Sequence, residues 1–343
     1  MLYRLIRPLL FRLAPERAQA AAIGALRLLR LGRTGEVRPV ESGAGVQLFG
    51  LRFANRIGLA AGFDKSARHL DELGQLGFGC IEVGSVTPRP QPGNPPPNLF
   101  RLTQDQALIN RMGFNNDGVE AVVRRLEARR YVGICGVNIG KNADTALTDA
   151  WRDYVTCLRA VYAAADYVTI NISSPNTQGL RQLQETDALR ELLGQLSEAR
   201  AGLAGIHRKR VPLLVKLAPD LDLANLDSLS EVLPAFEIDG VVATNTTTTR
   251  PDSLRSPYAA EAGGLSGQPL HALSTEVIRA LRSRLGNHIA ILGVGGISDI
   301  PTAHSTLAAG ADLLQLYTGL IYEGPRLVSR LIAATGGPAR AQD

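Results

Sequence analysis

Apolar runs of strand length recur along the chain, and helical periodicity follows each of the first seven. The runs lie at residues 57–62, 79–86, 133–140, 167–173, 211–217, 240–246, 289–297 and 313–320. The helix-like segments lie at residues 66–76, 118–130, 148–164, 187–204, 226–236, 273–285 and 301–309. Eight strands alternating with helices are the count of a (β/α)₈ barrel. We therefore predict an α/β fold in which residues 41–343 form a (β/α)₈ TIM barrel.

A doubly wound open sheet is the main alternative for such an alternation. That fold usually has fewer strands and carries an early glycine fingerprint, G-x-G-x-x-G. The glycine-rich run Gly293-Val294-Gly295-Gly296 does not match the fingerprint. We therefore reject a dinucleotide-binding Rossmann fold.

The first 40 residues follow the pattern of two amphipathic helices, which we treat as an N-terminal extension. Leucine or isoleucine recurs at positions 5, 6, 9, 10 and 13, and Pro15 suits the first turn of a second helix. Arg7, Pro8 and Arg12 interrupt the apolar region, which argues against a signal peptide. Two interpretations remain: a helical hairpin packed on the barrel, or a pair of helices that rests in a membrane surface.

The fourth apolar run places polar side chains at the end of an otherwise apolar strand. Positions 168, 170 and 172 are β-branched, whereas Thr169, Asn171 and Ser173 point to the opposite face. Pro175 ends the strand because proline cannot donate a ladder hydrogen bond. Taken alone, this pattern also fits an ordinary polar loop between a strand and a helix.

Polar and glycine residues gather at the carboxyl end of all eight predicted strands. They are Gly62 to Lys65, Gly84 and Ser85, Asn138 to Lys141, Asn171 to Asn176, Lys216, Thr244 to Thr246, Gly295 and Gly296, and Tyr317 to Gly319. In barrel enzymes this face holds the active site, so the pattern favours an enzyme over a structural barrel. Two long loops, at residues 85–116 and 247–271, leave the same face. We predict that the first, rich in proline, is rigid and that the second is a mobile lid.

Composition narrows the class of protein. The chain has 343 residues, 45% of them hydrophobic, and a net charge of +5 with no Lys/Arg run that would indicate a nucleic-acid partner. Its three cysteines lack metal or cluster spacing, so we predict no metal site and a reducing compartment. Arginine is the default cation, yet Lys65, Lys141 and Lys216 stand at strand ends, where a compact point charge has a use.

The residues at this face also suggest what it binds. Asn110, Asn115, Asn138, Asn171, Asn176 and Asn245 all lie there. Amide side chains both donate and accept hydrogen bonds, so a ring of them suits a planar molecule with alternating N–H and C=O groups. The glycines after strands seven and eight can hold a phosphate. Lys216 can stabilise the negative charge of a reduced flavin.

The chain resembles the dihydroorotate dehydrogenases, specifically the membrane-associated, quinone-using class 2 enzymes. The matching stretches are AAGFDK at 60–65, EVGSVTP at 82–88, NRMGFN at 110–115, NISSPNT at 171–177, KLAPD at 216–220, TNT at 244–246 and GVGGI at 293–297. The resemblance implies one FMN bound by Ala61, Gly62, Lys65, Ser85, Asn138, Asn171, Lys216, Thr244, Gly267, Gly296, Tyr317 and Thr318. It implies that dihydroorotate is bound by Lys65, Asn110, Arg111, Met112, Gly113, Phe114, Asn171, Asn176, Asn245 and Thr246.

The resemblance further implies that Ser174 is the catalytic base, where soluble relatives have cysteine. Ser174 would take a proton from C5 of dihydroorotate while a hydride leaves C6 for the flavin, giving orotate in pyrimidine (UMP) biosynthesis. A serine hydroxyl is a weak base unless a neighbour takes its proton, and Thr177 or an ordered water could relay it. Residue patterns alone do not choose between Ser174 and the neighbouring Ser173.

The implied electron acceptor is a membrane quinone. Because a quinone is lipid-soluble, the helices in residues 1–40 would then rest on the membrane surface and give it access to the flavin. The implied location is the cytoplasmic face of the inner cell membrane, as a peripheral protein. The alternatives are a soluble relative with another acceptor, a flavin barrel acting on RNA, and a non-catalytic binder of phosphate ligands.

Overall fold

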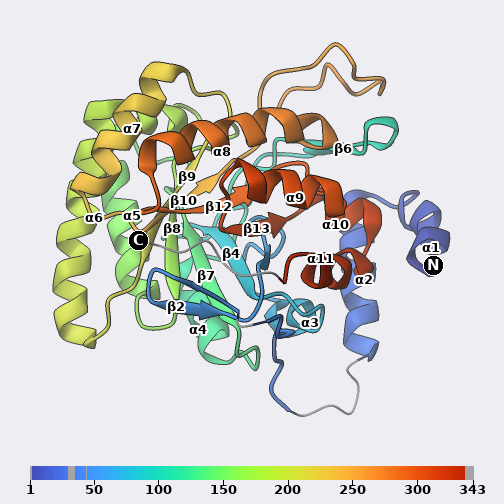
Figure 1. The fold of residues 1–343 in the computed structure, drawn as a ribbon, viewed down its shortest axis with the longest axis horizontal. Helices are drawn as coiled ribbons and strands as arrows, with labels where there is room; N and C mark the ends of the chain where they lie inside the picture. Colours follow the sequence, from blue (N-terminus) through green and yellow to red (C-terminus); the bar gives the residue numbers. More distant parts are fainter. Residues whose placement is uncertain (1, 30–34, 44, 337–343) are drawn as a thin grey trace.

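A closed barrel of parallel strands forms the centre of the molecule (Figure 1). The computed structural model describes residues 2–29, 35–43 and 45–336, and within them eight strands close into one barrel. In order around the barrel, they are β3 (Ile57–Leu59), β4 (Cys80–Val86), β7 (Ile134–Ile139), β8 (Tyr167–Asn171), β9 (Leu213–Leu217), β10 (Gly240–Ala243), β12 (Ala290–Val294) and β13 (Leu313–Leu316). The predicted (β/α)₈ barrel is confirmed.

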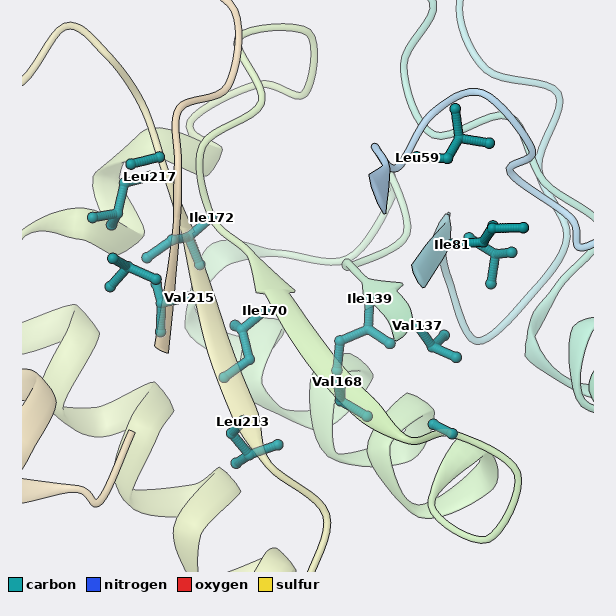
Figure 2. Close-up of a cluster of buried hydrophobic side chains, with 14 of the residues drawn as sticks. Leu59, Ile81, Val137, Ile139, Val168, Ile170, Ile172, Leu213, Val215 and Leu217 are labelled. Atoms are coloured by element: carbon teal, nitrogen blue, oxygen red, sulfur yellow. The ribbon is translucent and has the colours of Figure 1, made fainter. Parts of the chain in front are cut away.

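Helices surround the barrel and cover its outer face. They are α3 (Leu70–Gly74), α4 (Val119–Glu127), α5 (Ala150–Val161), α6 (Thr186–His207), α7 (Leu223–Ala235), α8 (His271–Leu285), α9 (Ile300–Ala309), α10 (Thr318–Glu323) and α11 (Arg326–Ala334). The outward side chains of the strands pack against them. In β8 these are Val168 and Ile170, which lie beside Val215 of β9 in the same buried cluster (Figure 2).

The two boundaries that differ most from the sequence prediction have local causes. Helix α3 begins at Leu70 and not at residue 66, because the Asp64 carboxylate accepts hydrogen bonds from the backbone N–H groups of Arg68 and His69 at 2.9 and 2.8 Å. These bonds hold the preceding residues in a turn. Strand β13 ends at Leu316 and not at residue 320, because helix α10 starts at Thr318.

A short hairpin closes the amino-terminal end of the barrel. Strands β1 (Val46–Leu48) and β2 (Leu51–Phe53) pair antiparallel, in a stretch where the sequence pattern predicted no strand. Phe53 is fully buried, and the Phe49 ring makes edge contacts with Phe53 and Tyr167 at centroid distances of 5.6 and 6.1 Å. The hairpin and residues near the amino-terminal ends of the barrel strands form one apolar cluster inside the barrel.

The two long loops contain a small antiparallel sheet that the sequence pattern did not predict. Strand β6 (Ala107–Asn110) lies between β5 (Leu99–Leu102) and β11 (Gly264–Gly267). In the second loop, Arg250 donates hydrogen bonds to backbone carbonyls that include those of Ala259, Glu261 and Gly263, at 3.1, 2.8 and 2.7 Å. Much of the predicted lid is therefore hydrogen-bonded structure, and its mobility stays a prediction.

Helix α1 (Leu2–Leu10) packs on α10, and helix α2 (Pro15–Leu29) packs on α3 and β5 (Figure 1). Arg7 donates a hydrogen bond to the Tyr322 carbonyl at 2.8 Å, and Gln19 donates one to the Phe63 carbonyl at 2.7 Å. Yet Leu5 and Leu9 are 74% and 61% exposed. The helices thus pack on the barrel with one face and leave an apolar face outside. Residues 1 and 30–34 of the predicted 1–40 unit lie outside the described residues.

Candidate active site

A pocket opens at the carboxyl end of the barrel, and the strand ends that the sequence singled out converge on it. Its walls come from Ala60, Ala61, Gly62, Lys65, Ser85, Leu99, Leu108, Asn110, Met112, Gly113, Phe114, Asn171, Ser174, Asn176, Lys216, Thr244, Asn245, Thr246, Ser266, Gly267, Leu270, Val294, Gly295, Gly296, Ile297, Gln315, Tyr317, Thr318 and Gly319. All predicted cofactor residues line it except Asn138. All predicted substrate residues line it except Arg111.

The two adjacent serines have different surroundings. Ser173 is fully buried, and its hydroxyl donates to Asn171 Oδ1 at 3.0 Å and accepts from Asn245 Nδ2 at 3.0 Å. Ser174 lines the pocket, and its hydroxyl accepts a hydrogen bond from the backbone N–H of Asn176 at 3.3 Å. Ser173 therefore holds the asparagines in place, whereas the Ser174 hydroxyl faces the pocket. Thr177 does not line it.

The asparagines form a hydrogen-bonded wall. Asn171 Nδ2 donates to Ser85 Oγ at 2.8 Å, and Asn176 Nδ2 donates to Asn110 Oδ1 at 3.1 Å. These residues come from strands or loops far apart in the sequence and meet because parallel strands end at one face. Such amides are fixed in orientation, as recognition of a planar polar ligand requires.

Two lysines bring positive charge to the pocket. Lys65 Nζ donates to Asn115 Oδ1 at 2.8 Å, and burial lowers the pKa of Lys65 to about 8, although the Glu16 carboxylate of α2 acts in the opposite direction. Burial also lowers the pKa of Lys216, while Glu82 raises it. The Lys216 ammonium donates no hydrogen bond to any residue in the described part of the chain. Its free hydrogens suit an anionic or carbonyl group of a bound ligand.

The glycine-rich rim can accommodate a phosphate group. Gly295 and Gly296 have φ angles of +138° and +67°, which L side chains rarely adopt. A Cβ at Gly296 would lie 2.6 Å from His271 Cβ, so only glycine fits there. Across the pocket, the Ser266 and Thr318 hydroxyls lie 2.8 Å apart. Consecutive backbone amides and two hydroxyls are the usual ligands of a phosphate.

Three residues that the sequence singled out serve the site from outside the pocket wall. Asn138 Nδ2 donates to Glu82 Oε1 at 2.9 Å, and its Oδ1 accepts from the Ser85 hydroxyl. The side chain of Arg111 pairs with that of Glu261 at 2.7 Å, and Arg111 does not line the pocket. Lys141, whose role the sequence left open, donates to the Thr145 carbonyl at 2.8 Å and so holds the loop after β7.

The sequence reasoning missed Arg181, which joins three of the site loops. Its guanidinium donates to the Ser173 carbonyl at 3.1 Å, the Thr246 carbonyl at 2.8 Å and the Asp220 carboxylate at 2.7 Å. Gln315, Ser266 and several apolar wall residues were also missed. No local pattern marks these positions, because each matters only through neighbours distant in the sequence.

Among residues 2–29, 35–43 and 45–336, no helix combines the length and apolarity that a membrane span requires. No group of three or more His, Cys, Asp or Glu side chains among them is arranged to hold a metal ion.

The chain is similar to known proteins over nearly its whole length. The family model described as dihydroorotate dehydrogenase matches residues 44–335. The chain is 52% identical to "Dihydroorotate dehydrogenase (quinone)" of Flavobacterium lutescens over 333 residues, covering 96% of this chain and 95% of that protein. It is 52% identical to the protein of the same name from Bordetella parapertussis over 342 residues, covering 98% of both.

Solved structures agree with this similarity. A crystal structure of DHODH from Eimeria tenella in complex with ferulenol superposes with a TM-score of 0.84 at 38% identity, covering 92% of this chain and 89% of that one. The ligand-free structure from the same organism gives a TM-score of 0.82 at 38% identity, covering 91% of this chain and 92% of that one.

Proposed function

The chain belongs to the dihydroorotate dehydrogenase family, and from this premise we propose that it oxidises dihydroorotate to orotate with FMN and reduces a quinone. It is thus a dihydroorotate:quinone oxidoreductase of pyrimidine biosynthesis. The observation that carries the proposal is the convergence of Lys65, Ser174, Lys216 and Gly296 on one pocket. These residues come from strand ends between residues 60 and 300. Their convergence at one face is expected of a barrel enzyme and not of a barrel with a purely structural role.

The pocket residues suit FMN. Gly295 and Gly296, with the Ser266 and Thr318 hydroxyls, would hold the phosphate, and Lys216 with Asn171 would lie against the ring system. The buried Gln315 Oε1 has no hydrogen-bond partner among the described residues, and such a ring would satisfy it together with the Lys216 ammonium at the pocket wall. When bound, FMN supplies the hydride acceptor and passes two electrons to the quinone.

The chain's own part in the reaction is to bind, orient and deprotonate the substrate. Asn110, Asn176 and Asn245 would hold the N–H and C=O groups of dihydroorotate, and the Lys65 ammonium would pair with its carboxylate. Ser174 Oγ faces the same space and would remove the proton from C5. Because no carboxylate or imidazole of the described residues lines the pocket, we infer that the Ser174 hydroxyl passes its proton to another hydroxyl or to water.

The apolar outer face of α1 and α2 suits association with a membrane surface as a peripheral protein. Leu5, Leu9 and Leu28 are 74%, 61% and 68% exposed, whereas the opposite face packs on the barrel. Because Gln19 contacts the Phe63 carbonyl and Glu16 acts on Lys65, helix α2 lies against the loop that carries Lys65 at the pocket wall. A lipid-soluble quinone could therefore enter between these helices. We assign this face to the cytoplasmic side of the inner membrane.

An anaerobic absorption spectrum tests the catalytic proposal. We expect purified protein to carry a flavin band that dihydroorotate bleaches and a quinone restores. A colourless protein would favour the non-catalytic phosphate binder. A band that dihydroorotate leaves unchanged would contradict the assigned substrate.

The membrane assignment has a separate test. We expect Leu5→Glu with Leu9→Glu to slow quinone reduction in lipid vesicles and to leave bleaching by dihydroorotate unchanged. Equal rates of quinone reduction by the native protein and the double variant would favour the alternative of a soluble acceptor.

A further inference from the structure

The eight barrel strands, all within the described part of the chain, carry only two charged residues. Glu82 on β4 is the single anion, and Lys216 on β9 is the single cation. Both are buried, with exposures of 0% and 5%. An isolated charge inside a protein is strongly unfavourable, so one buried anion and one buried cation in the same barrel suggest that each offsets the cost of burying the other.

The hydrogen bonds around Glu82 suit an ionised carboxylate. It accepts from Asn138 Nδ2 at 2.9 Å, Gln315 Nε2 at 2.8 Å and Tyr167 Oη at 3.1 Å. An ionised carboxylate only accepts hydrogen bonds, and all three contacts are of that kind. Burial, together with Glu82 itself, raises the pKa of Tyr167 well above its usual range, so the phenol keeps the proton it donates.

Within the described part of the chain, Glu82 is the only acidic group found to act on Lys216. The remaining titratable side chains on the inner strand faces and the pocket wall are Cys80, Tyr167, Tyr317 and Lys65. Burial raises the pKa of the Cys80 thiol, and it raises the pKa of Tyr317 to about 12, so both stay neutral near pH 7. Lys65 adds a second positive charge. Glu82 is therefore the carboxylate that can offset the cost of burying the Lys216 ammonium.

We propose that Glu82 is a positioning residue that keeps Lys216 protonated beneath the bound flavin. This role goes beyond the pocket wall, because Glu82 does not line the pocket and acts only through Lys216 and the amides it orients. It rests on the proposed function in one respect, namely that a flavin whose reduced form is anionic occupies the pocket. Without Glu82, burial would drive Lys216 toward its neutral form.

The pH dependence of the flavin midpoint potential tests the proposal. In the native protein Lys216 holds its proton in both redox states. In Glu82→Gln, Lys216 is neutral beside the oxidised flavin and takes up a proton on reduction. The potential should then fall more steeply with pH, by about 30 mV per unit for one extra proton per two electrons. The matched control is Glu82→Gln in a Lys216→Met background, in which the extra slope must vanish.

Two results would overturn the proposal. The first is a Glu82→Gln slope equal to that of the native protein. The second is an extra slope that persists when Lys216 is methionine, which would assign the proton to another group.

Thermal unfolding gives a readout that requires no bound flavin. Lys216→Met leaves a buried carboxylate without its counter-charge, so it should lower Tm, and adding Glu82→Gln should restore part of the loss. Losses that simply add would contradict the pairing, even if Glu82→Gln fails to bind flavin. If the native protein binds no flavin at all, the proposed function fails while this cycle still decides whether the two charges are coupled.

Discussion

The two ends of the barrel interior are built from the same strands but filled differently. At the amino-terminal end, Tyr167, Leu214 and Leu292 meet the β1–β2 hairpin in a fully buried apolar cluster. At the carboxyl end, Asn171 lies four residues beyond Tyr167 on β8 and Lys216 lies two residues beyond Leu214 on β9, and both line an open polar pocket. One strand thus serves both ends through its inward positions.

The difference teaches how the barrel separates stability from chemistry. The apolar end removes large side chains from water, which stabilises the fold. The polar end holds the Lys216 ammonium without a hydrogen-bond acceptor among the described residues, which costs stability but leaves its hydrogens available for ligand contacts. Glu82 and its three donors lie between the two ends and join them. Substitutions at the carboxyl end should therefore lower the reaction rate with little effect on stability. Substitutions at the amino-terminal end should lower stability with little effect on the reaction rate.

The largest expected effect on the reaction rate is that of Ser174→Ala at the carboxyl end of the barrel. Loss of the general base should slow anaerobic flavin bleaching by roughly 10²- to 10⁴-fold, with little change in stability. The matched control is Ser173→Ala, which removes hydrogen bonds to Asn171 and Asn245 but no group facing the pocket. Stopped-flow bleaching and thermal melts of both variants measure this. A slower Ser173→Ala than Ser174→Ala would reverse the assignment of the base.

The opposite result, lower stability with an unchanged reaction rate, is expected for Phe53→Ala at the amino-terminal end of the barrel. Phe53 is fully buried, so the cavity should lower the free energy of unfolding by about 3–5 kcal/mol. The bleaching rate of the folded protein should stay unchanged. Denaturant titration checks this against Leu223→Ala, an exposed position on α7 where less than about 0.5 kcal/mol is expected. A Phe53→Ala protein that is stable but slow would break the separation between the ends.

The smallest expected effect concerns the charge of Lys65 at the carboxyl end of the barrel. Burial lowers the pKa of Lys65 to about 8, so its ammonium is present below that pH and lost as pH rises through it. The KM for dihydroorotate should be constant at low pH and rise above pH 8, by about tenfold per unit at the limit. Lys65→Arg keeps its charge, so its KM should stay flat with pH. A flat native profile up to pH 10 would contradict a Lys65 contact with the substrate carboxylate.

Sequence patterns located most of this chemistry because parallel strands impose a rule. Every strand end of a (β/α)₈ barrel points to one face, so polar residues after apolar runs had to meet. That rule predicted the convergence of Lys65, Asn171, Lys216 and Gly296 before any coordinates. It failed for Arg181 and Gln315, since their partners are set by loop paths and by register across the barrel.

Alternation along the chain by itself determined the barrel and the face that carries the site, because side-chain periodicity is local and repeated strand–helix units impose parallel pairing. The tertiary structure decided what no local period encodes. It paired β6 with β11 across more than 150 residues, turned Ser174 rather than Ser173 toward the pocket, and placed Glu82 where its charge acts on Lys216. Those outcomes depend on packing and on the cost of burying charge, which are properties of the closed barrel as a whole.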